Sequence, residues 1–446
     1  MAKFTATSLG TNMVGLISFF SAFVFLIYYC SKNYSQGLEK LYSFILVVPL
    51  SYIDGLDTIT ALKIGPIGVT QFGIMLVFAF GFLKYKKIKF NIRNNWPIFV
   101  LLILYLVNLI FNVGNPYTIK DASTYFVPLL FLLSFLFFSN SFGYNDFINI
   151  SIKSLYLHSL LLFLLYSFWI LSGGSGRFGV TSMSLYCFSI PIMVQRIIEN
   201  KTSRKMIRTY KLAIVTQCAL LLLSQTRSLI IIVAFEVLFS LLSQKMTVKR
   251  AVKVFILLFI FVVSVFIAYS YVLRTGYASA GWAGRMFELT QTGFSTQSNV
   301  IRNQLMEYYI PLILSQPLGH GFGVVMPNWI MTNSGLGLST EITLGVDNLF
   351  LTYMYKFGII NFCVLVIIIT SSIFTLYKRS KNNIYCEKIV FFSFLFLLIP
   401  TAVMTGQALD DITVSCFFQA FIAASMNERR RMREGVLGYG KELSLN

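Results

Sequence analysis

Residues 212–243 read LAIVTQCALLLLSQTRSLIIIVAFEVLFSLLS, two apolar runs on either side of a short polar stretch that contains Arg227. A helix needs about 20 residues to cross the hydrocarbon core of a bilayer, and the length of each run approaches that number. The pattern predicts two membrane spans, 212–226 and 228–243, with a sharp turn of the chain at Arg227 between them.

The whole chain has the composition of a membrane protein. Of its 446 residues, 56% are hydrophobic and 12% are charged, whereas soluble domains carry about 25% charged residues. This composition excludes a soluble enzyme, a disordered chain and a disulfide scaffold. Because only helices or closed barrels satisfy backbone polar groups in lipid, we expect an all-α polytopic membrane protein with about 12–14 transmembrane helices. The predicted spans lie near 13–29, 41–53, 66–83, 97–113, 122–139, 154–171, 180–198, 212–226, 228–243, 254–272, 346–369, 389–405 and 412–426.

The positive charge of the chain indicates its orientation in the membrane. Lysine and arginine number 36 against 17 acidic residues, a formal net charge of +19. Most of these basic residues fall in alternate connections between the predicted spans, which is the positive-inside pattern and does not indicate nucleic-acid binding. The basic connections and the C-terminal tail are therefore predicted to be cytoplasmic, and the side of the N-terminus is left open. The connections predicted to face outside are 54–65, 114–121, 172–179, the turn at Arg227, 273–345 and 406–411.

Residues 273–345 form the longest connection in this scheme. Loops longer than about 12–15 residues are usually functional or disordered, and this one contains aromatic residues and an apolar helical pattern at 301–314. We expect a folded, partly helical external subdomain with at least one amphipathic helix. The predicted organisation is then N-terminal transmembrane helices at 1–272, the large loop at 273–345, C-terminal transmembrane helices at 346–426 and a basic cytoplasmic tail at 427–446.

Arginines on the predicted external side are the first candidates for function. Arg227 lies at the turn between two spans, where a charge at membrane depth indicates function by default. Arg177 lies in a glycine-rich loop, and Arg285 and Arg302 lie in the large loop. Guanidinium groups bind phosphate oxygens through two parallel hydrogen bonds, so a convergent set would suit a diphosphate. For each arginine alone, an interfacial or solvated charge is the alternative.

The motif PLGHGFG at residues 317–323 is a second candidate. A proline followed by three alternating glycines predicts a tight turn whose backbone is closely approached by another group. We expect Gly321 to take part in that approach. His320 is a candidate general base near neutral pH, and a loop histidine without a chemical role is the alternative.

Asp347 and Asn348 precede the predicted span at 346–369 and form a third candidate. Asp347 is either a proton acceptor or the N-terminal cap of the following helix. Glu236 and Lys356 lie within predicted spans, so both are expected to face the interior of the bundle. Whether they meet each other is left open.

The sequence contains no motif for a metal or a cofactor. It has two histidines, six isolated cysteines, no HExxH motif and no P-loop. We therefore expect neither a metal nor a cofactor.

Three pieces of this sequence resemble the O-antigen polymerase and ligase superfamily, of the Wzy and WaaL type. The stretch SQTRS at 224–228 is similar to the family's Ser-x-x-Arg-(Ser/Gly) between two spans. Arg302, Tyr309 and the stretch 317–323 are similar to the arginine, aromatic residue and glycine-rich stretch of its large periplasmic loop. Asp347 and Asn348, followed after nine residues by Gly358, are similar to a third motif in which the ligases carry a His-Asn-type pair. Because Asp347 stands where the ligases have their proposed catalytic base, the resemblance favours the polymerase.

The resemblance implies a metal-independent, inverting glycosyltransferase with a C-type transmembrane architecture in the bacterial inner membrane. Its site would face the periplasm, with undecaprenyl-diphosphate-linked oligosaccharides as donor and acceptor, membrane lipids around it and a chain-length regulator as a further candidate partner. Arg227 would stabilise the leaving diphosphate, helped by Arg302 and Arg285, and Asp347 or His320 would accept the proton. The further residues expected to contact substrate are Arg177, Asn348, Tyr309 and Gly321.

Two alternatives stay open at this point. The first is the related ligase, which moves finished polysaccharide onto lipid A core. The second is a transporter or lipid-oligosaccharide flippase with a similar number of spans. Transporters often have midplane sites built from repeats and broken helices, so the large loop and the lack of an internal repeat argue against the second.

Overall fold

A computed structural model provides the structure of the protein. It describes residues 21, 24–48, 63–64, 67–85, 92–139, 141–171, 181–199, 203–224, 227–242, 297–327, 329–332, 335–338, 344–346, 348–380, 390, 393, 395 and 411–433.

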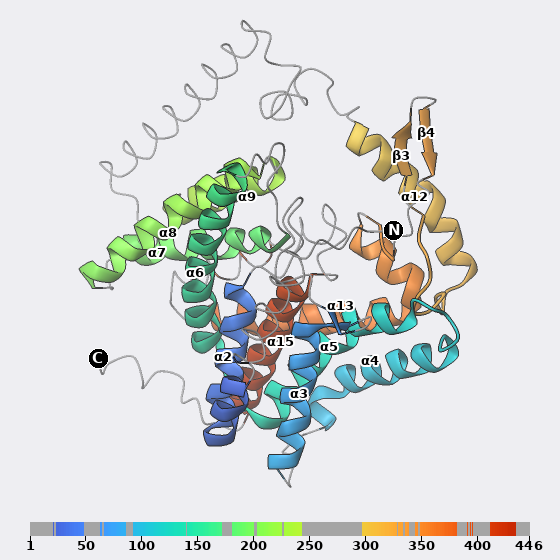
Figure 1. The fold of residues 1–446 in the computed structure, drawn as a ribbon, viewed down its shortest axis with the longest axis horizontal. Helices are drawn as coiled ribbons and strands as arrows, with labels where there is room; N and C mark the ends of the chain where they lie inside the picture. Colours follow the sequence, from blue (N-terminus) through green and yellow to red (C-terminus); the bar gives the residue numbers. More distant parts are fainter. Residues whose placement is uncertain are drawn as a thin grey trace, which may run out of the picture.

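The described part of the chain is predominantly helical (Figure 1). Its helices are α2 (Tyr34–Val47), α3 (Val69–Lys84), α4 (Ile92–Phe111), α5 (Thr118–Phe138), α6 (Tyr144–Leu171), the 3-10 helix η2 (Thr181–Leu185), α7 (Tyr186–Glu199), α8 (Arg204–Leu223), α9 (Arg227–Leu242), α12 (Gln297–Ser315), α13 (Leu349–Ser380) and α15 (Ile412–Arg433). Two short antiparallel hairpins depart from the all-α expectation, β1 (Lys63–Ile64) with β2 (Ile67–Gly68) and β3 (Trp329–Thr332) with β4 (Gly335–Leu338). Within the described residues, 4 helices are long and apolar enough to cross a membrane: 118–138, 144–167, 204–223 and 349–378. The chain is therefore an α-helical protein with membrane-spanning character.

Several helices begin earlier than the apolar pattern predicts. The span expected at 212–226 is the later part of α8, which begins at Arg204 after an N-cap at Ser203. The span expected at 154–171 is likewise the later part of α6. Hydropathy identifies only the apolar part of a helix, whereas hydrogen bonding and capping continue it into charged residues. The predicted separation of two helices near Arg227 is confirmed, because α8 ends at Leu223 and α9 begins at Arg227. Residues 225–226, where the sharp turn is expected, lie outside the described residues. The expected span 254–272, and 389–405 apart from single residues, lies outside the described residues.

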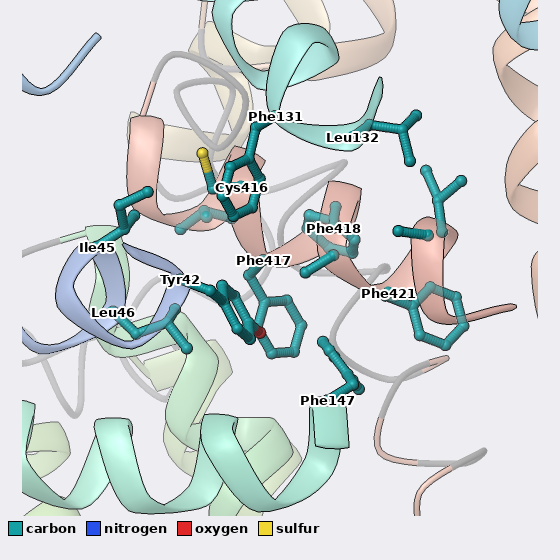
Figure 2. Packing of buried hydrophobic residues seen from close by; sticks show 14 of the residues in the cluster. Tyr42, Ile45, Leu46, Phe131, Leu132, Phe147, Cys416, Phe417, Phe418 and Phe421 are labelled. Atoms are coloured by element: carbon teal, nitrogen blue, oxygen red, sulfur yellow. The ribbon is translucent and has the colours of Figure 1, made fainter. Parts of the chain in front are cut away.

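The core lies where α2, α5, α6 and α15 pack together. Figure 2 shows Tyr42 of α2, Phe131 of α5, Phe147 of α6 and Phe417 of α15 gathered in one cluster. The rings of Phe147 and Phe417 lie 5.1 Å apart, and the Tyr42 hydroxyl lies 2.7 Å from Ser151 Oγ. Because α5 is largely buried and contacts α2, α3, α4 and α15, it is the central helix of this part of the bundle.

The helix expected at 301–314 is confirmed as α12, which packs on the first part of α13. Its buried face carries Leu305, Tyr309 and Ile313, one helical turn apart. The opposite face is mixed, because Val300 and Leu314 on it are 40% and 66% exposed beside the exposed Glu307. α12 therefore lacks the wholly polar outer face of an amphipathic helix, and the part of the loop before it lies outside the described residues.

A break at Gly358 divides α13 into two helical segments. Gly358 has φ 79° and ψ 170°, which lies outside helical geometry and in a region that essentially only glycine adopts. The segment after the break, residues 359–380, by itself exceeds the about 20 residues that a span needs. Residues 349–357 therefore form a separate helical segment at the start of α13, beside α12 (Figure 1).

We predict that Gly358→Ala lowers the free energy of unfolding by about 1–3 kcal/mol. A Cβ at this position would meet the backbone of Pro317 and Leu318 in addition to the strained φ. The matched control is Gly114→Ala between α4 and α5, because a Cβ there meets nothing within 4 Å. Thermal unfolding of the detergent-solubilised protein measures the effect, and equal midpoints for both variants would contradict this reading of the break.

Candidate functional site

The glycine-rich loop at 317–323 is seated on the break in α13. In a continuous helix, the carbonyl of Tyr355 would accept a hydrogen bond from the amide of Ile359. Here Ile359 N donates to Pro317 O over 2.9 Å, and Tyr355 O accepts from His320 N over 2.9 Å. Gly321 N donates to Lys356 O over 2.7 Å. The loop therefore satisfies the backbone groups that the break sets free.

The glycines of this loop allow close contact with other parts of the chain. Gly319, Gly321 and Gly323 have φ values of 85°, 91° and 79°. A Cβ at Gly321 would overlap the Asn112 side chain, and one at Gly323 would meet the backbone of Thr118 at the start of α5. The predicted tight, closely approached backbone is confirmed, and the approaching groups are those of the protein itself.

A buried ion pair joins the loop to α5 and α13. Lys356 Nζ lies 2.5 Å from Asp121 Oδ1, and the side chains are 0% and 2% exposed. The second carboxylate oxygen of Asp121 accepts from Gly323 N over 2.8 Å. Lys356 also lies 5.3 Å from the centroid of the Tyr125 ring. One carboxylate thus holds a lysine of α13 and the end of the glycine-rich loop.

The ion pair answers the question of whether Glu236 and Lys356 meet. Lys356 pairs with Asp121, while neither carboxylate oxygen of Glu236 has a hydrogen-bond partner within the described part of the chain. Sequence reasoning missed Asp121. The available signal was an acid at the edge of one predicted span and a lysine in another, because opposite charges in apolar surroundings tend to pair.

His320 is held against Tyr355. The two rings stack with centroids 4.0 Å apart and an interplanar angle of 21°. His320 Nδ1 lies 3.1 Å from Tyr355 O. No described residue forms a hydrogen bond with Nε2. The half-buried imidazole therefore has one ring nitrogen engaged with the protein and one available to a ligand.

Tyr309 of α12 and Asn348, which precedes α13, each form hydrogen bonds within the protein. The Tyr309 hydroxyl donates to Pro327 O over 2.7 Å, its ring lies 5.0 Å from that of Tyr355, and burial raises the pKa of its hydroxyl. Asn348 Oδ1 accepts from Leu351 N over 3.1 Å, so Asn348 caps the first turn of α13. Asp347, the cap considered from the sequence, lies outside the described residues.

Arg302 lies on α12 and is partly exposed. Among the described residues, no carboxylate lies within ion-pair distance of its guanidinium. Because Tyr309 contacts Tyr355 and the loop after α12 meets Ile359, the two helices run in the same direction. Arg302 lies seven residues before Tyr309 in α12, and Asn348 lies seven residues before Tyr355, a spacing of roughly 10 Å along a helix.

The remaining predicted site residues are not joined to this group by the structure. Arg227 begins α9, and nothing is described of its side chain. In Figure 1, α9 and α12 lie on different sides of the molecule. Arg177 and Arg285 lie outside the described residues. The structure thus brings His320, Gly321 and Tyr309 together, and a convergent set of arginines stays a prediction.

No family model matches the chain, and no curated protein matches its sequence.

We predict that Lys356→Met destabilises the protein by about 3–5 kcal/mol, because it leaves Asp121 buried and without its counter-ion. The double variant Asp121→Asn/Lys356→Met is expected to be more stable than Lys356→Met alone. The introduced asparagine would carry no charge, and its side-chain oxygen could still accept from Gly323 N. A double-mutant cycle of thermal unfolding measures this coupling, and additive effects would show that the pair does not act as a unit.

Proposed function

We propose that this protein is a Wzy-type polymerase that joins undecaprenyl-diphosphate-linked oligosaccharide repeats into O-antigen or a related surface polysaccharide. It would do so at the periplasmic face of the bacterial inner membrane. The three sequence motifs and the apolar helices support this class. The observation that carries the proposal is the placement of His320 by the glycine-rich loop, with one ring nitrogen available to a ligand.

The proposed reaction is a single displacement with inversion. The acceptor sugar hydroxyl attacks the anomeric carbon of the donor, and a new carbon–oxygen bond forms. The bond between that carbon and the diphosphate oxygen breaks, and the diphosphate leaves with the electron pair. The proton of the attacking hydroxyl passes to His320 Nε2, which makes His320 the general base.

Arginine side chains would stabilise the charge that grows on the leaving diphosphate. Arg302 suits this role because no described carboxylate neutralises it. Arg227 and Arg285 are proposed to assist on the strength of the resemblance. Because the diphosphate is already an activated leaving group, the proposed mechanism uses no metal ion.

Transport of a lipid-linked oligosaccharide is the second candidate function. Transporter sites are typically built from broken helices next to charged residues. The break in α13 at Gly358 and the buried pair of Lys356 with Asp121 fit that description. The fixed seating of the glycine-rich loop on the break favours the enzyme, since a transporter must move around its site.

We predict that His320→Gln, in a strain lacking the native gene, reduces polymer formation by about 10²–10⁴-fold, the usual contribution of a general base. Arg302→Ala is expected to reduce polymer as well, and Arg302→Lys less severely. The matched controls are Leu318→Ala, an exposed residue of the same loop, and Arg208→Ala, an exposed arginine on α8. Electrophoresis of lipopolysaccharide together with immunoblotting for the variant protein measures the outcome.

The products in this strain distinguish the candidate functions. Loss of polymerase leaves single repeat units on the lipopolysaccharide core, whereas loss of ligase leaves bare core. Failure of transport leaves lipid-linked repeats on the cytoplasmic side. Long polymer in the His320→Gln strain would remove His320 from the mechanism. Bare core with lipid-linked polymer on the periplasmic side would replace the polymerase by the ligase, and bare core with lipid-linked repeats on the cytoplasmic side would replace it by the transporter.

A further inference from the structure

The hydrogen bonds of Tyr355 determine which nitrogen of His320 carries a proton. Tyr355 O contacts both the backbone amide of His320, at 2.9 Å, and its Nδ1 atom, at 3.1 Å. A carbonyl oxygen has two lone pairs and no proton, so it can only accept. The contact with Nδ1 therefore requires a proton on Nδ1, and a neutral imidazole then has a lone pair on Nε2.

That carbonyl is available only because α13 is broken. The helical partner of Tyr355 O would be the amide of Ile359, which instead donates to Pro317 O. The redirection follows from the conformation of Gly358, at φ 79° and ψ 170°. The stacked ring of Tyr355 then restrains the plane of the imidazole.

We propose that Gly358 is a positioning residue for His320: the break it makes in α13 turns the Tyr355 carbonyl into the acceptor for Nδ1–H and leaves Nε2 as the proton-accepting atom. Gly358 does not touch the reacting atoms in this scheme. It acts through Tyr355, whose carbonyl contacts His320. The use of Nε2 as a general base rests on the proposed function, whereas the tautomer itself does not.

The test is ¹⁵N NMR of the full chain labelled with ¹⁵N-histidine, at a pH where His320 is neutral. The chain has only two histidines, and His158 contacts Tyr186 and Ser182 through its two ring nitrogens and serves as an internal reference. The His320→Gln variant identifies the His320 signals. We expect the ratio of the Nδ1–H form to the Nε2–H form of His320 to be at least about fivefold higher than for histidine in water, as one net hydrogen bond provides, so that the Nδ1–H form predominates.

Three variants separate the helix break from other causes. Gly358→Ala is expected to shift His320 toward the mixture found for histidine in water, and Gly114→Ala to leave it unchanged. Tyr355→Leu removes the stacked ring and keeps the carbonyl, so the Nδ1–H form should persist. If Gly358→Ala fails to fold, the spectrum of the unaltered protein still tests the proposal, because a predominant Nε2–H form would overturn it.

A predominant Nε2–H form in the unaltered protein would overturn the proposal. An unchanged tautomer in folded Gly358→Ala would also overturn it. Loss of the Nδ1–H form in Tyr355→Leu, with no loss in Gly358→Ala, would overturn it as well. Polymer formation by His320→Gln together with the expected spectrum would instead remove His320 from the proposed mechanism and leave the tautomer assignment standing.

Discussion

The ion pair between Lys356 and Asp121 is the interaction on which the arrangement of this site depends. Both side chains are almost fully buried, so neither charge is tolerable without the other. Asp121 is fixed near the start of α5, the central helix, and it holds both α13 and Gly323 through its two oxygens. The position of the glycine-rich loop thus follows from one buried carboxylate on a rigid helix.

From this anchor, a short series of backbone contacts leads to the candidate base. Gly358 breaks α13, the loop at 317–323 hydrogen-bonds across the break, and Tyr355 engages His320. These contacts use backbone N–H and C=O groups of α13 that would bond to each other in a regular helix. The chain replaces those helical hydrogen bonds with bonds to the loop, so the irregular backbone next to the spans keeps its polar groups paired.

The sequence was sufficient to predict the helical class, the boundary between two helices near Arg227, the helix at 301–314 and the tight turn of the glycine-rich motif, because each depends on neighbouring residues. It did not reveal the pairing of Asp121 with Lys356, which lie 235 positions apart. The exposed apolar residues of α12 and the cap at Asn348 were also missed. These features depend on which surfaces meet and on the local backbone, and periodicity alone contains neither.

We propose that the chain elongates lipid-linked oligosaccharides without a metal ion. The most direct measurement is incubation of the purified protein in lipid nanodiscs with undecaprenyl-diphosphate-linked repeats and a chelator, followed by electrophoresis of the products. The account predicts a ladder of lengthening chains, with one undecaprenyl diphosphate released for each bond formed. No elongation of repeats by folded protein in nanodiscs, or elongation that stops when the chelator is added, would contradict it.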